Sequence, residues 1–218
     1  YYQIVGVVKQ RARVNIGGRS QESVFLPFTT MQQTLNQGDV IHFLAASAYK
    51  DVSIQRIIDD KERLQWFAAK FSNAKDVFFI GRGIDYAICM EGSLKMKEIS
   101  YIHSEAYAAG ELKHGTISLI EDGTLVIGVL TQSELYEKTL SNLVEVKSRG
   151  AYLMGLTTSG NYDIEDTVNF AFFLPKTDEH FADSLAVVPL QLLGYYLAVS
   201  KGLDVDKPRN LAKSVTVE

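Results

Sequence analysis

The chain has 218 residues, of which 46% are hydrophobic and 22% charged, with four prolines and a formal net charge of −4. This composition is typical of a globular protein that buries a full core, in one large domain or two small ones. A net negative charge without blocks of like charge argues against nucleic acid or an anionic membrane as the main partner, because both require a clustered basic surface. The composition therefore favours small-molecule chemistry.

The single cysteine, Cys89, excludes a disulfide framework and leaves no ligand set for a structural zinc site. We expect Cys89 to be a buried apolar residue and the protein to be cytoplasmic, because free thiols persist in a reducing compartment. The chain does not open on a basic-then-apolar signal pattern, and no apolar run approaches the roughly 20 residues of a membrane helix. We therefore expect no membrane-spanning segment, and we also expect neither a metal nor a cofactor.

Residues 1–48 contain short extended pieces, such as YYQIVGVV and GDVIHFLA, that are broken by turns. Their β-branched and aromatic residues favour strands, but the pieces do not pair into one evident sheet. We leave this segment unassigned; it would fit the remnant of a preceding domain. Residues 49–73 predict an amphipathic linker helix, because apolar side chains recur there at helical spacing between charged ones. These side chains are Ile54, Ile57, Ile58, Leu64, Phe67 and Phe71.

From residue 74 onward the pattern becomes regular. The sequence predicts four apolar strands, DVFFIG, TLVIGVLT, AYLMGLTT and VNFAFFLP, and helices that end near Ile102, span 133–148 and span 184–202. Continuous apolar strands that alternate with helices indicate a parallel sheet covered on both faces. The predicted fold class is therefore a doubly wound α/β sheet over residues 74–202, followed by a polar tail at 203–218. Ligands of such sheets bind at the carboxyl ends of the strands.

Two of those strand ends carry a recognisable pattern. Gly-Arg-Gly at 81–83 ends the first strand, but one Gly-x-Gly is equally a phosphate loop or a simple turn. Ser133 follows the second strand in the position of a helix cap, which would ordinarily suit an anion. Glu134 and Glu137 already place negative charge there, so we predict a capped helix and not a phosphate site.

The stretch EGSLKMKEIS contains a lysine between two glutamates. At about 100° per residue, Glu91, Lys95 and Glu98 fall within an arc of roughly 60° on one helix face. Such a row is either an exposed salt-bridge ladder or a half-buried pair whose altered pKa values suit proton transfer. The spacing alone leaves both interpretations open, and it does not assign His103 or His114.

The last residues, KPRNLAKSVTVE, form a polar tail that carries an isolated lysine, Lys213, after Ala212. A terminal segment is usually frayed. The alternative is that the tail docks over a site and delivers an amine, because lysine forms an imine with a ketone when a base is near.

Two blocks, GRGIDYAICMEGSLKMKEISYIHSEAYAAGELKHG and VVPLQLLGYYLAVSKGLDVDKPRNLAKSVTVE, resemble the isomerase region of the glutamine–fructose-6-phosphate amidotransferases. The resemblance covers about residues 52–218. It implies that residues 74–202 are the second of two flavodoxin-like sugar-isomerase domains and that residues 203–218 are a catalytic tail. It also implies fructose 6-phosphate as substrate, glucosamine 6-phosphate as product, and a glutaminase domain in the full-length protein.

The resemblance further implies the roles of single residues. Lys213 matches the lysine that forms an imine with C2 of the sugar, and Ala212 matches a backbone contact to it. Glu98 matches the base that moves a proton between C1 and C2. Lys95 matches the lysine that assists this movement, and Glu91 is its neighbouring carboxylate.

His114 matches a histidine that takes part in ring opening in the partner subunit's site, so the resemblance implies a homodimer. Three features depart from the family pattern. Thr116 stands where many members have proline, residues 1–60 contain no match to the phosphate loop Ser-Gln-Ser-Gly-Glu-Thr, and Tyr1 stands where a glutaminase would begin with cysteine. A second hypothesis is therefore a sugar-isomerase domain that binds a sugar phosphate without turning it over.

Overall fold

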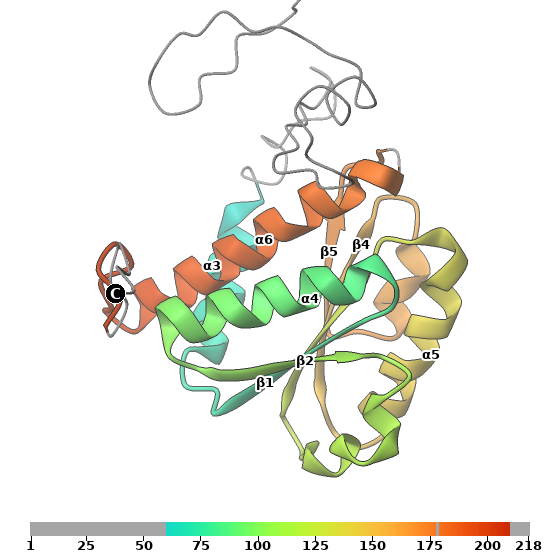
Figure 1. Ribbon diagram of the computed structural model, residues 1–218, viewed down its shortest axis with the longest axis horizontal. Coiled ribbons are helices and arrows are strands. Elements are labelled where there is room, and N and C mark those ends of the chain that lie inside the picture. Colours follow the sequence, from blue (N-terminus) through green and yellow to red (C-terminus); the bar gives the residue numbers. More distant parts are fainter. Residues whose placement is uncertain (1–59, 178, 210–218) are drawn as a thin grey trace, which may run out of the picture. The chain divides into compact units, whose positions relative to one another are not determined.

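The computed structural model of the chain describes residues 60–177 and 179–209 (Figure 1). Within these residues it forms a five-stranded sheet in which every neighbouring pair of strands is parallel. The strands are β1 Asp76–Gly81, β2 His103–Ala108, β3 Leu125–Leu130, β4 Tyr152–Thr158 and β5 Phe170–Leu174. The predicted doubly wound α/β class is confirmed. The predicted strand-like segment 1–48 and the first part of the predicted linker helix lie outside the described residues.

The strand order is β2-β1-β3-β4-β5, which is the order of the flavodoxin-like sheets. β1 lies between β2 and β3, and Val77 of β1 is in register with Ser104 on one side and Leu125 on the other. The chain therefore winds outward first in one direction and then in the other. Because the winding reverses between β1 and β3, the carboxyl ends of these two strands form the topological switch point of the sheet.

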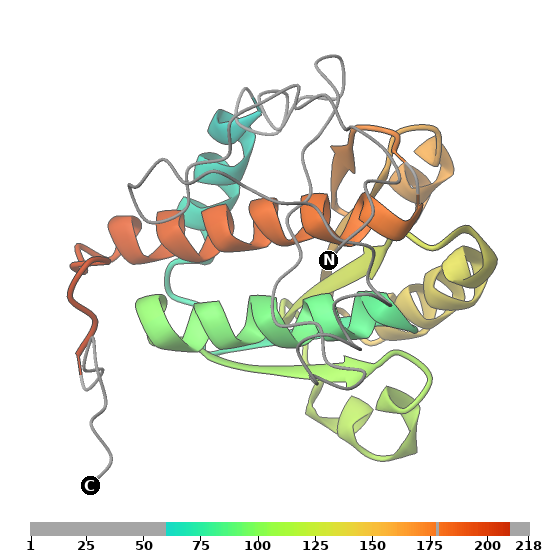
Figure 2. The ribbon, with the colours of Figure 1, turned by 45° about the horizontal axis from the view of Figure 1, so that its top comes forward.

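Helices cover both faces of the sheet (Figures 1 and 2). One face carries α3 Lys61–Phe71, α4 Ile84–Lys95 and α6 Glu179–Ser200, and α6 packs against both of the others. The other face carries α5 Tyr136–Lys147. Each face of the sheet has its own hydrophobic core, and alternate residues of β1 point into one or the other. Val77 and Phe79 pack with α3, α4 and α6, whereas Phe78 and Ile80 pack on the side of α5. This alternation follows from the two-residue period of a strand.

The structure differs from the predicted elements at the end of one helix and in one strand. The predicted helix does not continue to Ile102, because α4 ends at Lys95 and a π-helix, η1 Met96–Ser100, completes it. The strand β2 was missed altogether. Its sequence, HSEAYA, has few of the side chains that favour strands, and it lies at the sheet edge, where it pairs only with β1 and stays partly exposed.

Helix α6 corrects the expectation that no apolar run reaches the length of a membrane helix. Residues Ala182–Ser200 are long enough and apolar enough to cross a membrane by length and composition alone. Half of this window is buried inside the protein, and Leu190, Leu193 and Leu197 of α6 are core residues. A core helix passes the same test, so the finding is weak evidence for a membrane segment.

Candidate active site

Glu91, Lys95 and Glu98 meet at the end of α4, as their spacing predicted. The Lys95 ammonium donates a hydrogen bond to Glu98 Oε2 at 2.7 Å, and Glu91 Oε1 lies 3.7 Å from the same nitrogen. The three side chains are 28–34% exposed, so the cluster is half-buried and open to a ligand. Glu98 Oε1 has no hydrogen-bond partner among the described residues, which leaves one carboxylate oxygen available.

The cluster sets the charge state of Lys95. The hydrogen bond to Glu98 raises the pKa of Lys95 above its ordinary value; burial opposes this increase, and the charge of Glu91 adds to it. Lys95 is therefore an ammonium group at neutral pH. Such a group cannot act as a base, but it can hold a neighbouring carboxylate in one orientation and stabilise negative charge that develops on a ligand. In this cluster the carboxylates are the groups that can accept a proton.

Glu98 is carried by the π-helix and not by regular α-helix. η1 is closed by a hydrogen bond from Ser100 Oγ to the Met96 carbonyl at 2.6 Å, and Ser100 is fully buried. The next residue, Tyr101, has a left-handed backbone (φ 56°, ψ 26°) and turns the chain into β2. Single-turn π-helices are rare and are frequent at functional sites, so the local geometry agrees with a functional role for this end of α4.

His114 and Glu98 lie at opposite ends of the parallel strands. Strand β2 runs between them: η1, which carries Glu98, precedes its amino end, and the 3₁₀ helix Leu112–His114 follows its carboxyl end. A strand of this length spans about 20 Å. One chain therefore does not bring exposed His114 to the Glu98 cluster. His103 is a surface residue whose Nδ1 lies 2.8 Å from Asp76 Oδ1.

Lys213 and Ala212 lie outside the described residues, but the chain that leads to them is held next to the cluster. After α6, the Lys201 ammonium donates to the Ser100 carbonyl at 2.7 Å. The backbone N–H of Arg209 donates to the Tyr101 hydroxyl, also at 2.7 Å. One contact is made to Ser100, the last residue of the π-helix, and the other to Tyr101, which directly follows it. The base of the C-terminal segment therefore lies beside the helix end that carries Glu98.

The switch point of the sheet is occupied by a carboxylate that the sequence did not reveal. Asp85, in the first turn of α4, is only 1% exposed and accepts hydrogen bonds from Thr131 N at 2.9 Å and Thr131 Oγ1 at 2.5 Å. Gln132 N also approaches it at 3.4 Å. Burial raises the pKa of Asp85, and the Thr131 hydrogen bonds oppose this increase. The backbone N–H groups of Thr131 and Gln132, which could otherwise bind a ligand anion, already donate to the carboxyl group of Asp85.

This arrangement changes the account of the turn after β3. Ser133 was predicted to cap the following helix, but it lies in a 3₁₀ turn, and α5 begins only at Tyr136. Asp85 adds a carboxyl group to the turn that carries Glu134 and Glu137, because it accepts a hydrogen bond from Gln132 N. That this turn is not a phosphate site stays a prediction. The carboxyl ends of β1 and β3 thus carry the buried carboxyl group of Asp85, whereas the cluster around Glu98 lies at the opposite ends of the strands.

Asp183 of α6 is a second acidic residue close enough to Asp85 to be affected by its charge. Its environment predicts how the stability of the protein depends on pH. Its Oδ1 is buried without a hydrogen-bond partner among the described residues, and burial, with a smaller contribution from Asp85, raises its pKa. The raised pKa means that the native state binds this proton more tightly than the unfolded state. Stability from this residue is therefore present at low pH and is lost as pH rises through the raised pKa.

Replacing Asp183 by asparagine is accordingly expected to raise the free energy of unfolding by about 1 kcal/mol at pH 7, because a buried unpaired charge is removed. The gain should disappear below the ordinary aspartate pKa of about 3.9, where the carboxyl is protonated in both states. Urea denaturation at a series of pH values measures both effects. Asp206→Asn, at an exposed position, is the control and should leave the curve unchanged. A constant difference across the pH series would contradict the assignment.

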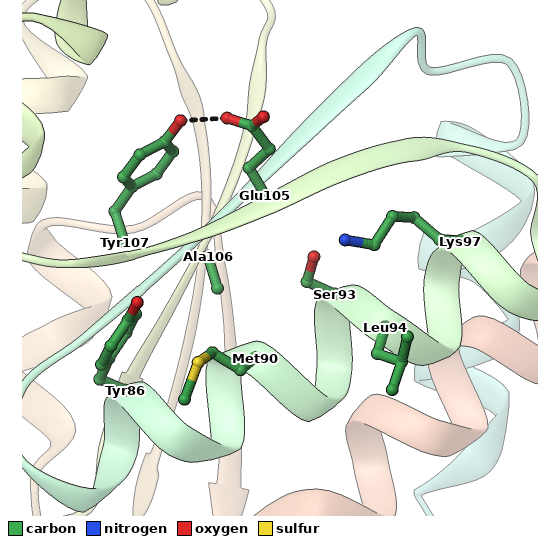
Figure 3. A pocket seen from close by; sticks show the side chains of 8 residues that line it. All are labelled: Tyr86, Met90, Ser93, Leu94, Lys97, Glu105, Ala106 and Tyr107. Atoms are coloured by element: carbon green, nitrogen blue, oxygen red, sulfur yellow. Dashed lines mark hydrogen bonds between the residues drawn. The ribbon is translucent and has the colours of Figure 1, made fainter.

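A groove of about 500 Å³ lies between α4 and β2 (Figure 3). Tyr86, Met90 and Tyr107 line it together with Lys97 and Glu105, and the Tyr107 hydroxyl donates to Glu105. Lys97 is two residues from Lys95 on a helix, so the two side chains point in roughly opposite directions. The groove therefore belongs to a different face from the Glu98 cluster. Among the residues that the structure describes, no three His, Cys, Asp or Glu side chains form a candidate metal site.

Comparison with known proteins identifies the domain. The family model described as SIS domain matches residues 70–201. Over 195 residues, the chain is 53% identical to the glutamine–fructose-6-phosphate aminotransferase [isomerizing] of Caldanaerobacter subterraneus subsp. tengcongensis, covering 89% of this chain and 32% of that protein. Its 50% identity to the protein of the same name from Clostridium tetani extends over 88% of this chain and 32% of that protein. The chain thus spans about a third of the length of these curated relatives.

A solved structure agrees with the sequence comparison. The C-terminal domain of glucosamine-fructose-6-phosphate aminotransferase from Francisella tularensis superimposes with a TM-score of 0.65 at 38% identity. The match covers 71% of this chain and 43% of that chain. Because the family model covers more than half of the sequence and the parallel five-stranded fold agrees with this neighbour, the chain belongs to the SIS domain family.

Proposed function

We propose that this chain is the second sugar-isomerase domain of a glutamine–fructose-6-phosphate aminotransferase. It would convert fructose 6-phosphate and glutamine-derived ammonia to glucosamine 6-phosphate. The observation that carries the proposal is the Lys95–Glu98 pair at 2.7 Å, half-buried at the end of α4 beside the anchored base of the C-terminal segment. The names of relatives that are 50–53% identical support the same activity.

The chemistry assigns one step to each side chain. The Lys213 amine attacks C2 of the open-chain ketose, and water leaves as the imine forms. Ammonia then replaces the lysine on C2, which releases the Lys213 amine. Glu98 removes a proton from C1 and returns it to C2. The carboxylate does this with the oxygen that Lys95 does not hold. The C1 hydroxyl also loses its proton while the imine nitrogen on C2 gains one, so that C1 becomes the aldehyde carbon and C2 carries the amine.

The remaining residues support these steps. Lys95 stays protonated and orients Glu98, while Glu91 adds charge that keeps Lys95 in the ammonium form. The backbone of Ala212 contacts the sugar. His114 acts in ring opening in the site of a partner subunit, which fits its position about one strand length from the Glu98 cluster of its own chain. The protein is accordingly proposed to be a cytoplasmic homodimer.

The full-length protein is proposed to contain a glutaminase domain, as the source of ammonia, and a first isomerase domain with the phosphate loop. Two features support an external phosphate site. Asp85 accepts the N–H groups at the switch point, and within residues 60–177 and 179–209 the cluster of Glu91, Lys95 and Glu98 contains one cation, Lys95, that is already paired. The phosphate of a sugar held at this cluster by its reactive end would then be bound by residues of the first isomerase domain.

The test is conversion of fructose 6-phosphate to glucose 6-phosphate, measured through a coupled dehydrogenase. It is run on the 218-residue chain and, in parallel, on the complete gene product that carries it. Conversion by the complete protein is expected, with a lower rate or none for the chain alone. Binding of fructose 6-phosphate by the complete protein without conversion would overturn the proposal in favour of a sugar-phosphate-binding domain without turnover.

A further inference from the structure

The segment after α6 is fastened to the residue that follows the π-helix. Arg209 makes two contacts with Tyr101: its backbone N–H donates to the hydroxyl at 2.7 Å, and its guanidinium carbon lies 4.2 Å from the ring centroid. Upstream, the carboxylate of Asp204 accepts hydrogen bonds from the backbone N–H groups of Asp206 and Lys207, at 3.0 and 3.2 Å. The segment is thus folded into a turn before it reaches Tyr101.

Tyr101 is a fixed point on the body of the domain. The residues on either side of it, Ser100 and Ile102, are 0% and 2% exposed, and its own left-handed backbone is the only positive φ among the described residues other than glycine. A left-handed backbone at a residue other than glycine persists only where the surrounding structure holds it. Lys201 adds to this by donating to the Ser100 carbonyl. The ring and hydroxyl of Tyr101 therefore hold a defined position relative to Glu98, three residues earlier.

We propose that Tyr101 and Arg209 are positioning residues that keep the C-terminal segment within reach of the Glu98 cluster. This inference rests on the proposed function, because it assumes that Lys213 is the lysine that forms the imine with the sugar. Lys213 follows Arg209 by four residues, so its Cα lies within about 14 Å of the anchored Cα in any conformation. If the contact is lost and the turn at Asp204 opens with it, the nearest tether is Leu203, next to the end of α6, and ten residues span up to about 35 Å.

The two radii set the size of the effect. A 2.5-fold larger radius corresponds to a volume about 15-fold larger, through which the Lys213 amine would be distributed. The frequency with which the amine meets the substrate carbon should fall by a similar factor, because chemistry requires the reacting atoms to be held close together. Loss of the anchor is therefore expected to lower kcat by about 10-fold and to leave KM almost unchanged.

The anchor is tested by cleavage after Arg209 with an arginine-specific protease, which leaves Lys213 uncut and releases the nine-residue peptide NLAKSVTVE. Tyr101→Phe keeps the ring under the guanidinium and removes the hydroxyl, so we expect cleavage about 3-fold faster than in the unchanged protein. Tyr101→Leu removes both contacts and should increase the rate by about 10-fold. The control is Tyr195→Phe, on an exposed tyrosine of α6. Mass spectrometry of the released peptide gives the rates, and equal rates in all four proteins would overturn the anchor.

The positioning role is tested separately in the complete protein by the rate of fructose 6-phosphate conversion. Arg209→Ala and Tyr101→Leu should lower kcat at constant KM, and Arg209→Lys should restore part of the loss, because a lysine retains the cation over the ring. Faster cleavage with unchanged kcat would overturn the positioning role. Full activity of Lys213→Ala would instead refute the proposed function. The cleavage rates would still show whether Tyr101 anchors Arg209.

Discussion

Replacement of Lys213 by alanine is expected to abolish the covalent trapping of fructose 6-phosphate by borohydride. Borohydride reduces an imine between the lysine nitrogen and C2 to a stable amine, which adds the mass of the reduced sugar phosphate to the protein. Without the amine no imine forms, so the adduct should fall below about 1% of its level in the unchanged protein. Isomerisation should fall by about 10³-fold or more, because loss of a nucleophile removes the covalent route altogether.

Lys207→Ala is the matched control for this experiment. Lys207 is an exposed lysine of the same C-terminal segment, and its contact with Asp204 is made through the backbone N–H, which alanine retains. Its adduct yield should equal that of the unchanged protein, and peptide mapping should locate the adduct on the peptide that contains Lys213. Adduct formation that persists unchanged in Lys213→Ala would show that another lysine is the nucleophile.

The strands that are buried on both faces could be predicted from the sequence, because such strands consist mainly of apolar residues. β1, β3, β4 and β5 are runs of mainly apolar residues, and most of their side chains are buried. β2 could not be found in this way. At the edge of the sheet it is half-buried, and it pairs through its backbone, which any residue supplies. Its omission also hid the separation of His114 from Glu98, which are only 16 residues apart in sequence.

The candidate site was predictable where its contacts are local. Glu91, Lys95 and Glu98 interact across one or two turns of a helix, so their spacing alone brought them together. The contacts of Asp85 with Thr131 and of Arg209 with Tyr101 join residues far apart in the chain. Single-sequence periodicity contains no information on such pairs. An aspartate in the first turn of a helix is ordinarily explained by the helix dipole, which gave no reason to look further.

Replacement of Glu98 by glutamine is expected to stop exchange of the C1 proton with solvent while leaving substrate binding intact. Glutamine has the same shape and keeps an oxygen for the Lys95 ammonium, but its amide cannot accept the proton from C1. Removal of a general base costs about 10²- to 10⁴-fold in rate. Nuclear magnetic resonance measures the loss of the C1 proton signal of fructose 6-phosphate in deuterated buffer, and equilibrium dialysis measures binding.

The pattern of results in Glu98→Gln distinguishes a base from a structural ion pair. As a half-exposed partner of Lys95, Glu98 contributes at most about 1 kcal/mol to stability, so the variant should unfold within a few degrees of the unchanged protein. Glu62→Gln, in the first turn of α3, is the control and should retain both exchange and stability. Imine trapping at Lys213 should also survive in Glu98→Gln, because the imine forms before the proton leaves C1. Exchange at the unaltered rate in this variant would remove Glu98 from the reaction and leave the pair with Lys95 as a surface contact alone.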